Sequence, residues 1–94
     1  MKNLEATGTI VRVLETEVRG ENQFKTRKVH LKTEEEYPQT IELQFTQGNV
    51  TLLDGKKEGD KVKITYNLKG KEYTKDGNPL VFNTLQGWKI EKLA

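Results

Sequence analysis

One stretch of the chain places flat or cationic side chains at alternate positions. The residues that share this spacing are Phe24, Thr26, Lys28, His30 and Lys32. The side chains of a β-strand alternate between its two faces, so these five are expected on the outer face of one strand. Aromatic and imidazole rings can stack on nucleobases and lysines can bind phosphates. This face therefore has the chemistry needed to hold a single-stranded nucleic acid.

A second group with the same spacing follows later in the chain. Its members are Lys69, Lys71, Tyr73 and Lys75. They precede Asp76-Gly77, a pair of residues typical of a two-residue hairpin turn. A tyrosine among lysines in a mobile hairpin can close over a bound strand, and stacking of one base on it contributes on the order of 1–3 kcal/mol. The alternative, in which Tyr73 packs on the end of the fold, is left open.

Two further residues are expected to reach the same ligand. Arg27 has the opposite parity to its neighbours, but its long side chain can still reach the rim of the fold. Gln44, on the outer face of the following strand, can hydrogen-bond to bases. Glu42 lies on that face as well and adds an anion, which predicts a modest affinity or binding that relies on the loops. The predicted nucleic-acid-binding residues are Phe24, Arg27, Lys28, His30, Lys32, Gln44, Lys69, Lys71, Tyr73 and Lys75.

Catalytic chemistry is poorly supplied by this sequence. It contains no cysteine and no serine, and its only histidine, His30, lies between two lysines. The carboxylates of residues 34–36 lack the alternating spacing of a calcium loop. The glycines of residues 55–61 lack the spacing of a phosphate-binding loop. We therefore predict a non-enzymatic protein with no catalytic residue, no metal site and no cofactor.

The distribution of charge points to an anionic partner more clearly than the total does. The 94 residues include 16 lysines and arginines against 14 acids, a formal net charge of only +2. Residues 24–33 nevertheless hold four cations and no acid, and residues 56–75 hold seven lysines and three acids. Lysines on outer strand faces also serve solubility and protect sheet edges. Two separate basic segments favour an anionic ligand over that interpretation.

A small barrel is the simplest fold that positions these residues. Alternating apolar residues predict strands over residues 4–14, 24–33, 39–46, 59–70 and 80–90, with one or two helical turns over 47–53. Gly8 and a change of parity between Ile10 and Val13 predict a bend or bulge in the first strand. Five strands with a helix between the third and the fourth are the arrangement of the OB-fold, a partly open Greek-key barrel. The prediction is an all-β protein with one OB-fold domain over residues 1–94.

The apolar parity of each predicted strand gives the expected core. The expected core residues are Val29, Leu31, Ile41, Leu43, Phe45, Val62, Ile64, Tyr66, Leu68, Leu85, Trp88 and Ile90. In an OB-fold, the ligand groove is formed by the second and third strands with the loops that join strands one to two and four to five. Both basic groups are thus expected at that groove.

Four short segments carry a more specific signal. They are Tyr37-Pro38, Leu52-Leu53-Asp54, Gly59-Asp60-Lys61-Val62 and Gly87-Trp88-Lys89-Ile90. With the sequence around them, over about residues 4–93, they resemble a family of small, uncharacterised OB-fold proteins of bacteria and their phages. That family has features of single-stranded DNA-binding proteins. The resemblance implies an OB-fold and single-stranded DNA binding, and it supplies no catalytic residues.

The predicted function is a non-enzymatic OB-fold module that binds single-stranded DNA in phage or bacterial DNA replication or recombination. RNA is left open as the ligand. A protein-interaction or assembly module, which pairs through an exposed strand edge and includes a homo-oligomer, is the alternative. The sequence has no run of about 18 apolar residues and no apolar signal core near its start. A cytoplasmic protein of a bacterial or phage-infected cell, with no membrane partner, is expected.

Overall fold

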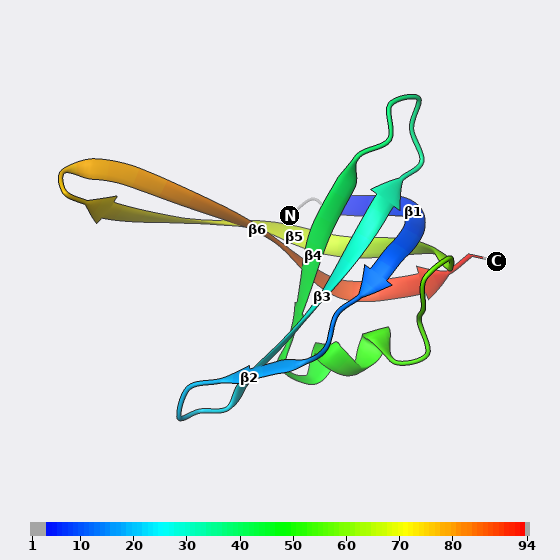
Figure 1. Cartoon of the computed structure of the whole chain (residues 1–94), viewed down its shortest axis with the longest axis horizontal. Helices are drawn as coiled ribbons and strands as arrows, with labels where there is room; N and C mark the ends of the chain where they lie inside the picture. The colour runs from blue at the N-terminus through cyan, green and yellow to red at the C-terminus, as the bar shows by residue number, and fades with distance from the viewer. Residues whose placement is uncertain (1–3, 94) are drawn as a thin grey trace.

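A β-sheet that closes on itself forms the body of the protein (Figure 1). The computed structural model describes residues 4–93. Its elements are β1 (Leu4–Val13), β2 (Glu17–Arg19), β3 (Phe24–Thr33), β4 (Thr40–Thr46), the 3-10 helix η1 (Gln47–Leu53), β5 (Lys61–Lys75) and β6 (Asn78–Lys92). The strand order is β1-β5-β6-β4-β3-β2, and β1 also pairs with β3, which closes the ring. The five long strands and η1 form the predicted OB-fold barrel.

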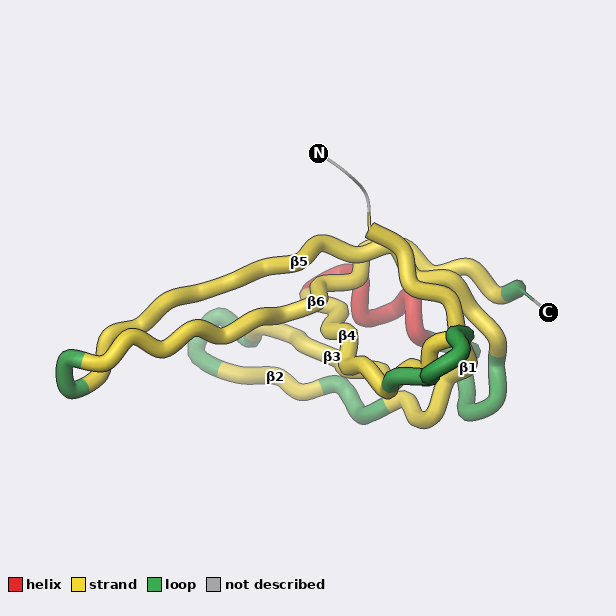
Figure 2. The backbone as a smooth tube through the Cα atoms, turned by 90° about the horizontal axis from the view of Figure 1, so that it is seen from above, coloured by secondary structure: helices red, strands yellow, loops and turns green. Residues whose placement is uncertain are grey.

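The strands differ from the prediction in two places. The polar stretch expected as a turn contains the short strand β2, so the sheet has six strands instead of five. The two strands expected to stop at Gly70 and to break at Gln86-Gly87 run on instead. Each is 15 residues long, and together they form a hairpin that projects beyond the barrel (Figures 1 and 2). Gly70 does not end the strand because it stays in the ladder, paired with Asn83.

The turn of this hairpin was predicted correctly. Asp76 and Gly77 have φ values of 52° and 79°. Two consecutive positive φ angles define the type I′ turn, whose twist matches that of the flanking strands. The turn sets the register of the hairpin. Lys75 pairs with Asn78, and each following pair lies one residue earlier in β5 and one residue later in β6.

The predicted bend and bulge in β1 are confirmed. Gly8 pairs with Thr33 of β3 on one side and with Val62 of β5 on the other. A Cβ atom on Gly8 would overlap the carbonyl oxygen of Lys32, so the close crossing of the strands requires glycine. The pairing between β1 and β3 then slips by one residue between Ile10 and Arg12. The strand can therefore curve from one neighbour to the other.

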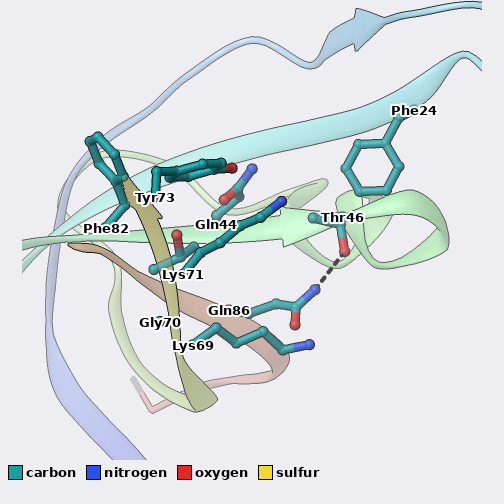
Figure 3. Close-up of a pocket in the computed structure, with 10 residues that line it drawn as sticks. Phe24, Gln44, Thr46, Lys69, Gly70, Lys71, Tyr73, Phe82 and Gln86 are labelled. Atoms are coloured by element: carbon teal, nitrogen blue, oxygen red, sulfur yellow. Dashed lines mark hydrogen bonds between the residues drawn. The ribbon is translucent and has the colours of Figure 1, made fainter. Parts of the chain in front are cut away.

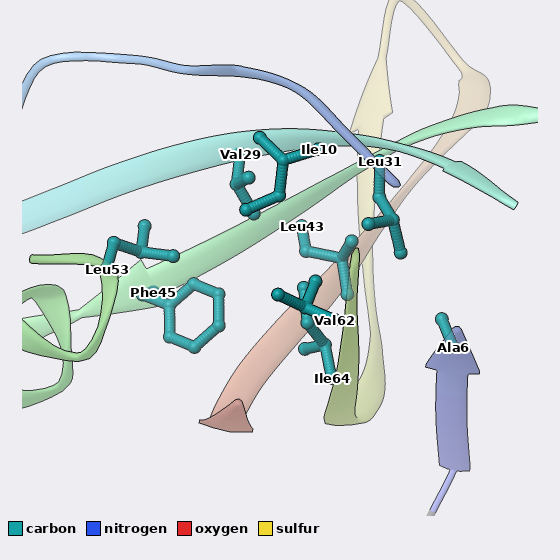
Figure 4. Close-up of a cluster of buried hydrophobic side chains, with 9 residues drawn as sticks. All are labelled: Ala6, Ile10, Val29, Leu31, Leu43, Phe45, Leu53, Val62 and Ile64. Atoms are coloured by element: carbon teal, nitrogen blue, oxygen red, sulfur yellow. The ribbon is translucent and has the colours of Figure 1, made fainter. Parts of the chain in front are cut away.

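The core fills the interior of the ring (Figure 4). Its members are Ala6, Ile10, Val29, Leu31, Leu43, Phe45, Leu53, Val62 and Ile64. Strand β6 contributes little bulk, because Gly87 lies where the Phe45 ring needs room. A Cβ on Gly87 would be 2.5 Å from the Cζ atom of Phe45. Ile41, Tyr66, Leu85 and Ile90 of the predicted core are partly buried against this cluster.

Two predicted core residues lie outside it. Trp88 is 38% exposed, because it is the extra residue of a β-bulge: Thr65 pairs with Lys89 and Tyr66 with Gly87, which leaves Trp88 unpaired. Leu68 is 59% exposed. It has the inward parity of its strand, but it lies beyond the pairs that the described residues of β1 make with β5, in the part of β5 that belongs to the projecting hairpin.

Candidate nucleic-acid interface

A groove of about 740 Å³ lies between the barrel and the projecting hairpin (Figure 3). Strands β3 and β4 provide one side of it, and β5 and β6 provide the other. The lining residues are Phe24, Gln44, Thr46, Lys69, Gly70, Lys71, Tyr73, Phe82, Thr84 and Gln86. Five of the predicted binding residues, Phe24, Gln44, Lys69, Lys71 and Tyr73, are thus brought together at one surface.

The register of the hairpin explains why these side chains share one face. Lys69 lies directly opposite Thr84, and Lys71 lies opposite Phe82. Residues that face each other across an antiparallel pair project from the same side of the sheet. Farther along β6, Gln86 pairs in parallel with Gln44 of β4, so the same face continues from the hairpin onto the barrel.

Three aromatic rings in the groove are accessible. Tyr73 and Phe82 make an edge-to-face pair with ring centroids 5.8 Å apart, and they are 47% and 56% exposed. The Lys71 ammonium lies 5.2 Å from the centroid of the Tyr73 ring. Phe24, 43% exposed, stands on the other side of the groove (Figure 3). Exposed rings near cations are the features on which unpaired bases stack.

The floor between the aromatic rings is polar and uncharged. The amide Nε2 of Gln86 donates a hydrogen bond to Oγ1 of Thr46 at 2.9 Å, which fixes the orientation of that amide. Gln44 and Thr84 complete the floor, and none of the lining residues within the described part of the chain is acidic. The floor can therefore donate and accept hydrogen bonds without repelling an anion.

The lysines of β5 divide into two groups. In the barrel half, Lys61 pairs with Glu34 at 2.7 Å and Lys63 with Glu5 at 3.5 Å. In the hairpin half, no carboxylate of residues 4–93 lies within ion-pair distance of Lys69, Lys71 or Lys75. The positive charge that remains without an anionic partner on β5 is thus concentrated at the groove.

The remaining predicted residues lie elsewhere. Arg27 holds the barrel together: its Nε donates to the carbonyl oxygen of Leu14 at 3.0 Å and its Nη1 lies 2.9 Å from Oδ1 of Asp54. Lys32 pairs with Thr40, at the end of β3 away from Phe24.

Lys75 adjoins the hairpin turn. Lys28 lines a neighbouring hollow, described below. His30 is held between two side chains, Arg12 and Glu42, and its own side chain is only 20% exposed. These residues do not line the groove.

Sequence reasoning missed the contribution of β6. Phe82, Thr84 and Gln86 line the groove, and none of them was predicted to bind. The predicted turn at Asp76-Gly77 contained the signal, because counting outward from a two-residue turn places Phe82 opposite Lys71 and on the same face.

A model of a known protein family matches most of this chain. Residues 5–91 match the model of a domain of unknown function, DUF3127. The chain belongs to the DUF3127 family. No curated protein matches its sequence.

Solved structures similar to this DUF3127 chain share its fold. The mitochondrial single-stranded DNA-binding protein Rim1 of S. cerevisiae is 14% identical with a TM-score of 0.69, over 98% of this chain and 95% of that chain. A Plasmodium falciparum SSB in complex with single-stranded DNA is 15% identical with a TM-score of 0.62, over 100% and 96% of the two chains. At these identities the likeness shows the fold. It confirms the OB-fold, and together with the DUF3127 match it confirms the resemblance to an uncharacterised family of OB-fold proteins.

Residues 4–93 of the DUF3127 chain hold neither a metal-ligand cluster nor a membrane-spanning helix. No group of three or more histidine, aspartate or glutamate side chains is arranged to hold a metal ion there. None of the helical segments in the same residues has the length and apolar character that crossing a membrane requires.

Proposed function

We propose that this DUF3127 protein is a non-enzymatic module that binds single-stranded DNA in the groove between the barrel and the β5–β6 hairpin. One observation carries the proposal: three exposed aromatic rings line the same groove as Lys69 and Lys71, which have no anionic partner among residues 4–93. Flat rings for bases and cations for phosphates are what binding of a single strand without sequence preference requires. The solved structure of a protein with this fold in complex with single-stranded DNA supports the choice of ligand.

Each part of the groove has a role in this proposal. Tyr73 and Phe82 provide a stacking surface on the hairpin, and Phe24 provides another on β3. Lys69 and Lys71 bind the phosphates that pass along the hairpin. The amides of Gln44 and Gln86 hydrogen-bond to base edges. Such a module would act where single strands are exposed, in DNA replication or recombination in the cytoplasm of a bacterial or phage-infected cell.

A titration with a fluorescently labelled oligonucleotide tests the proposal. A length of about 20 nucleotides is generous beside the roughly 4–16 nucleotides that one OB-fold covers. We expect binding at low salt. The affinity should fall as the salt concentration rises, because binding releases counterions from the phosphates and added salt opposes that release. Absence of binding at low salt would overturn the proposal. An RNA strand of matched sequence, used as competitor, decides between the two nucleic acids.

An assembly module is the second candidate, and one observation favours it. Strand β5 pairs with the described residues of β1 as far as Tyr66, so within residues 4–93 one edge of residues 67–75 has no strand partner. Free edges can pair with another chain, but lysines along an edge oppose such pairing, and this edge carries three. A stable dimer in solution whose interface covers residues 67–75 would favour assembly over DNA binding.

A further inference from the structure

A second hollow adjoins the groove at the place where β4 and β6 separate. Their parallel pairing consists of Leu43 with Leu85 and Gln44 with Gln86. Next to these pairs, a space of about 410 Å³ opens between the two strands. Gln44 and Thr84 line both this hollow and the groove. A single strand that occupies the groove can therefore continue into the second hollow.

Among the described residues that line the second hollow, Glu42 carries the one carboxylate. Contacts with His30 and, through it, with Arg12 fix the orientation of this carboxylate. The Oε2 atom of Glu42 lies 2.8 Å from Nε2 of His30, and Nδ1 of His30 lies 2.7 Å from Nη1 of Arg12. A guanidinium can only donate hydrogen bonds, so Nδ1 must accept and Nε2 carries the proton that it donates to Glu42. The three residues are cross-strand neighbours on β1, β3 and β4, which holds this chain of contacts in place.

The other carboxylate oxygen of Glu42 remains available. The Glu42 side chain is 50% exposed, and its Oε1 lies 3.8 Å from Nζ of Lys28, beyond hydrogen-bond distance. Lys28 offsets part of the negative charge without occupying the acceptor. The amides of Gln44 and Asn83 line the same hollow. The hollow thus presents one oriented carboxylate acceptor, and its lining also includes the Lys28 ammonium and the amides of Gln44 and Asn83.

We propose that the second hollow is a base-reading subsite in which Glu42 accepts a hydrogen bond from the exocyclic amino group of a base. This inference rests on the proposed binding of single-stranded DNA. A carboxylate repels phosphate and accepts from an amino group, so the hollow suits a base edge better than the backbone. Cytosine offers the N4 amino donor to a carboxylate, whereas thymine has an acceptor oxygen, O4, at the same position. Glu42 then gives a preference for cytosine over thymine, and His30 acts as its positioning residue.

The test compares two labelled oligonucleotides of about 20 nucleotides, oligo-dC and oligo-dT, bound to the full chain at low salt and mildly alkaline pH. We expect the wild-type protein to bind oligo-dC about fivefold more tightly, as one hydrogen bond to a charged acceptor allows. In Glu42→Gln this preference disappears, because an amide can donate to thymine O4 as readily as it accepts from cytosine. The matched control is Glu34→Gln, which removes a carboxylate that pairs with Lys61 and lines neither hollow. It keeps the preference.

His30→Ala tests the positioning role. It is expected to lower the ratio of the two affinities while oligo-dT still binds, a change that a loss of folding would not produce. Equal wild-type affinities for the two oligonucleotides, or a preference retained in Glu42→Gln, would overturn the subsite. If binding still depends on Tyr73 in that case, the proposal of single-stranded DNA binding stands. Failure of the wild-type protein to bind either oligonucleotide would overturn both.

Discussion

The aromatic side chains of this protein fall into two groups that differ in what surrounds them. Phe45 is fully buried in the core, whereas Tyr73 and Phe82 stay about half exposed although they contact each other. Exposed aromatic rings gain little for folding, because the stabilisation comes from removing apolar surface from water. Their position beside Lys71 is best explained by a ligand that covers them.

Replacement of one of these rings tests that explanation directly. Tyr73→Ala is expected to weaken binding of a single-stranded oligonucleotide by about 1–3 kcal/mol, the range for loss of one stacked base. Tyr37→Ala is the matched control, since Tyr37 is 76% exposed and lies outside the groove. Both affinities are measured by fluorescence anisotropy. Equal losses in the two variants would show that the groove rings have no special role.

The elements that frame the groove depend on close contact between β4 and β6. These strands share only two residue pairs, so their separation is set largely by the packing of Phe45 against Gly87. The contact holds the base of the hairpin against the barrel. Side chains of the hairpin and of β4 can then line one groove.

A methyl group at this contact is expected to destabilise the barrel. Gly87→Ala should lower the free energy of unfolding by about 1–3 kcal/mol, the usual cost of overpacking a core. Gly48→Ala serves as control, because a Cβ there meets nothing within 4 Å. Denaturant unfolding followed by circular dichroism measures both. A Gly87→Ala variant as stable as Gly48→Ala would contradict the packing argument.

At the scale of the whole molecule, the lysines of β5 differ along the strand: those in the barrel half pair with carboxylates, and those in the hairpin half have no such partner among residues 4–93. The lysines of the barrel half of β5 and of β6 meet carboxylates, as Lys63 meets Glu5 and Lys92 meets Asp60. Net charge is therefore a poor guide to this protein, because its cations without anionic partners on β5 lie along one projecting element.

The salt dependence of binding tests which lysines of β5 contact phosphates. Each phosphate contact to a single strand contributes about −0.7 to the slope of log K against log salt. Lys71→Gln is expected to make the slope shallower by about that amount, whereas Lys63→Gln should leave it unchanged because Lys63 already pairs with Glu5 and Glu91. Titrations at four or more salt concentrations give the slopes. Equal changes in slope for the two variants would mean that an ion pair with a carboxylate does not decide which lysines bind phosphate.

Local pattern was enough to predict most of the architecture. The alternation of apolar residues, the glycines and the Asp76-Gly77 turn gave the long strands, the helix and the OB-fold, because strand period and turn type depend on residues close in sequence. The same alternation placed Phe24 on the same side as Lys28, and Lys71 on the same side as Tyr73. Half of the predicted binding set meets in the groove for this reason.

What the tertiary structure alone decided was which of these side chains remain available to a ligand. Arg27 is paired with Asp54 and His30 is held by Glu42 and Arg12, through contacts between segments that are distant in sequence. The bulge that leaves Trp88 unpaired is likewise a feature of the pairing between β5 and β6. Strand alternation is a property of one segment, whereas ion pairs, bulges and facing walls follow from the register between segments. The turn sets that register within the β5–β6 hairpin, and closure of the barrel sets it between the other strands.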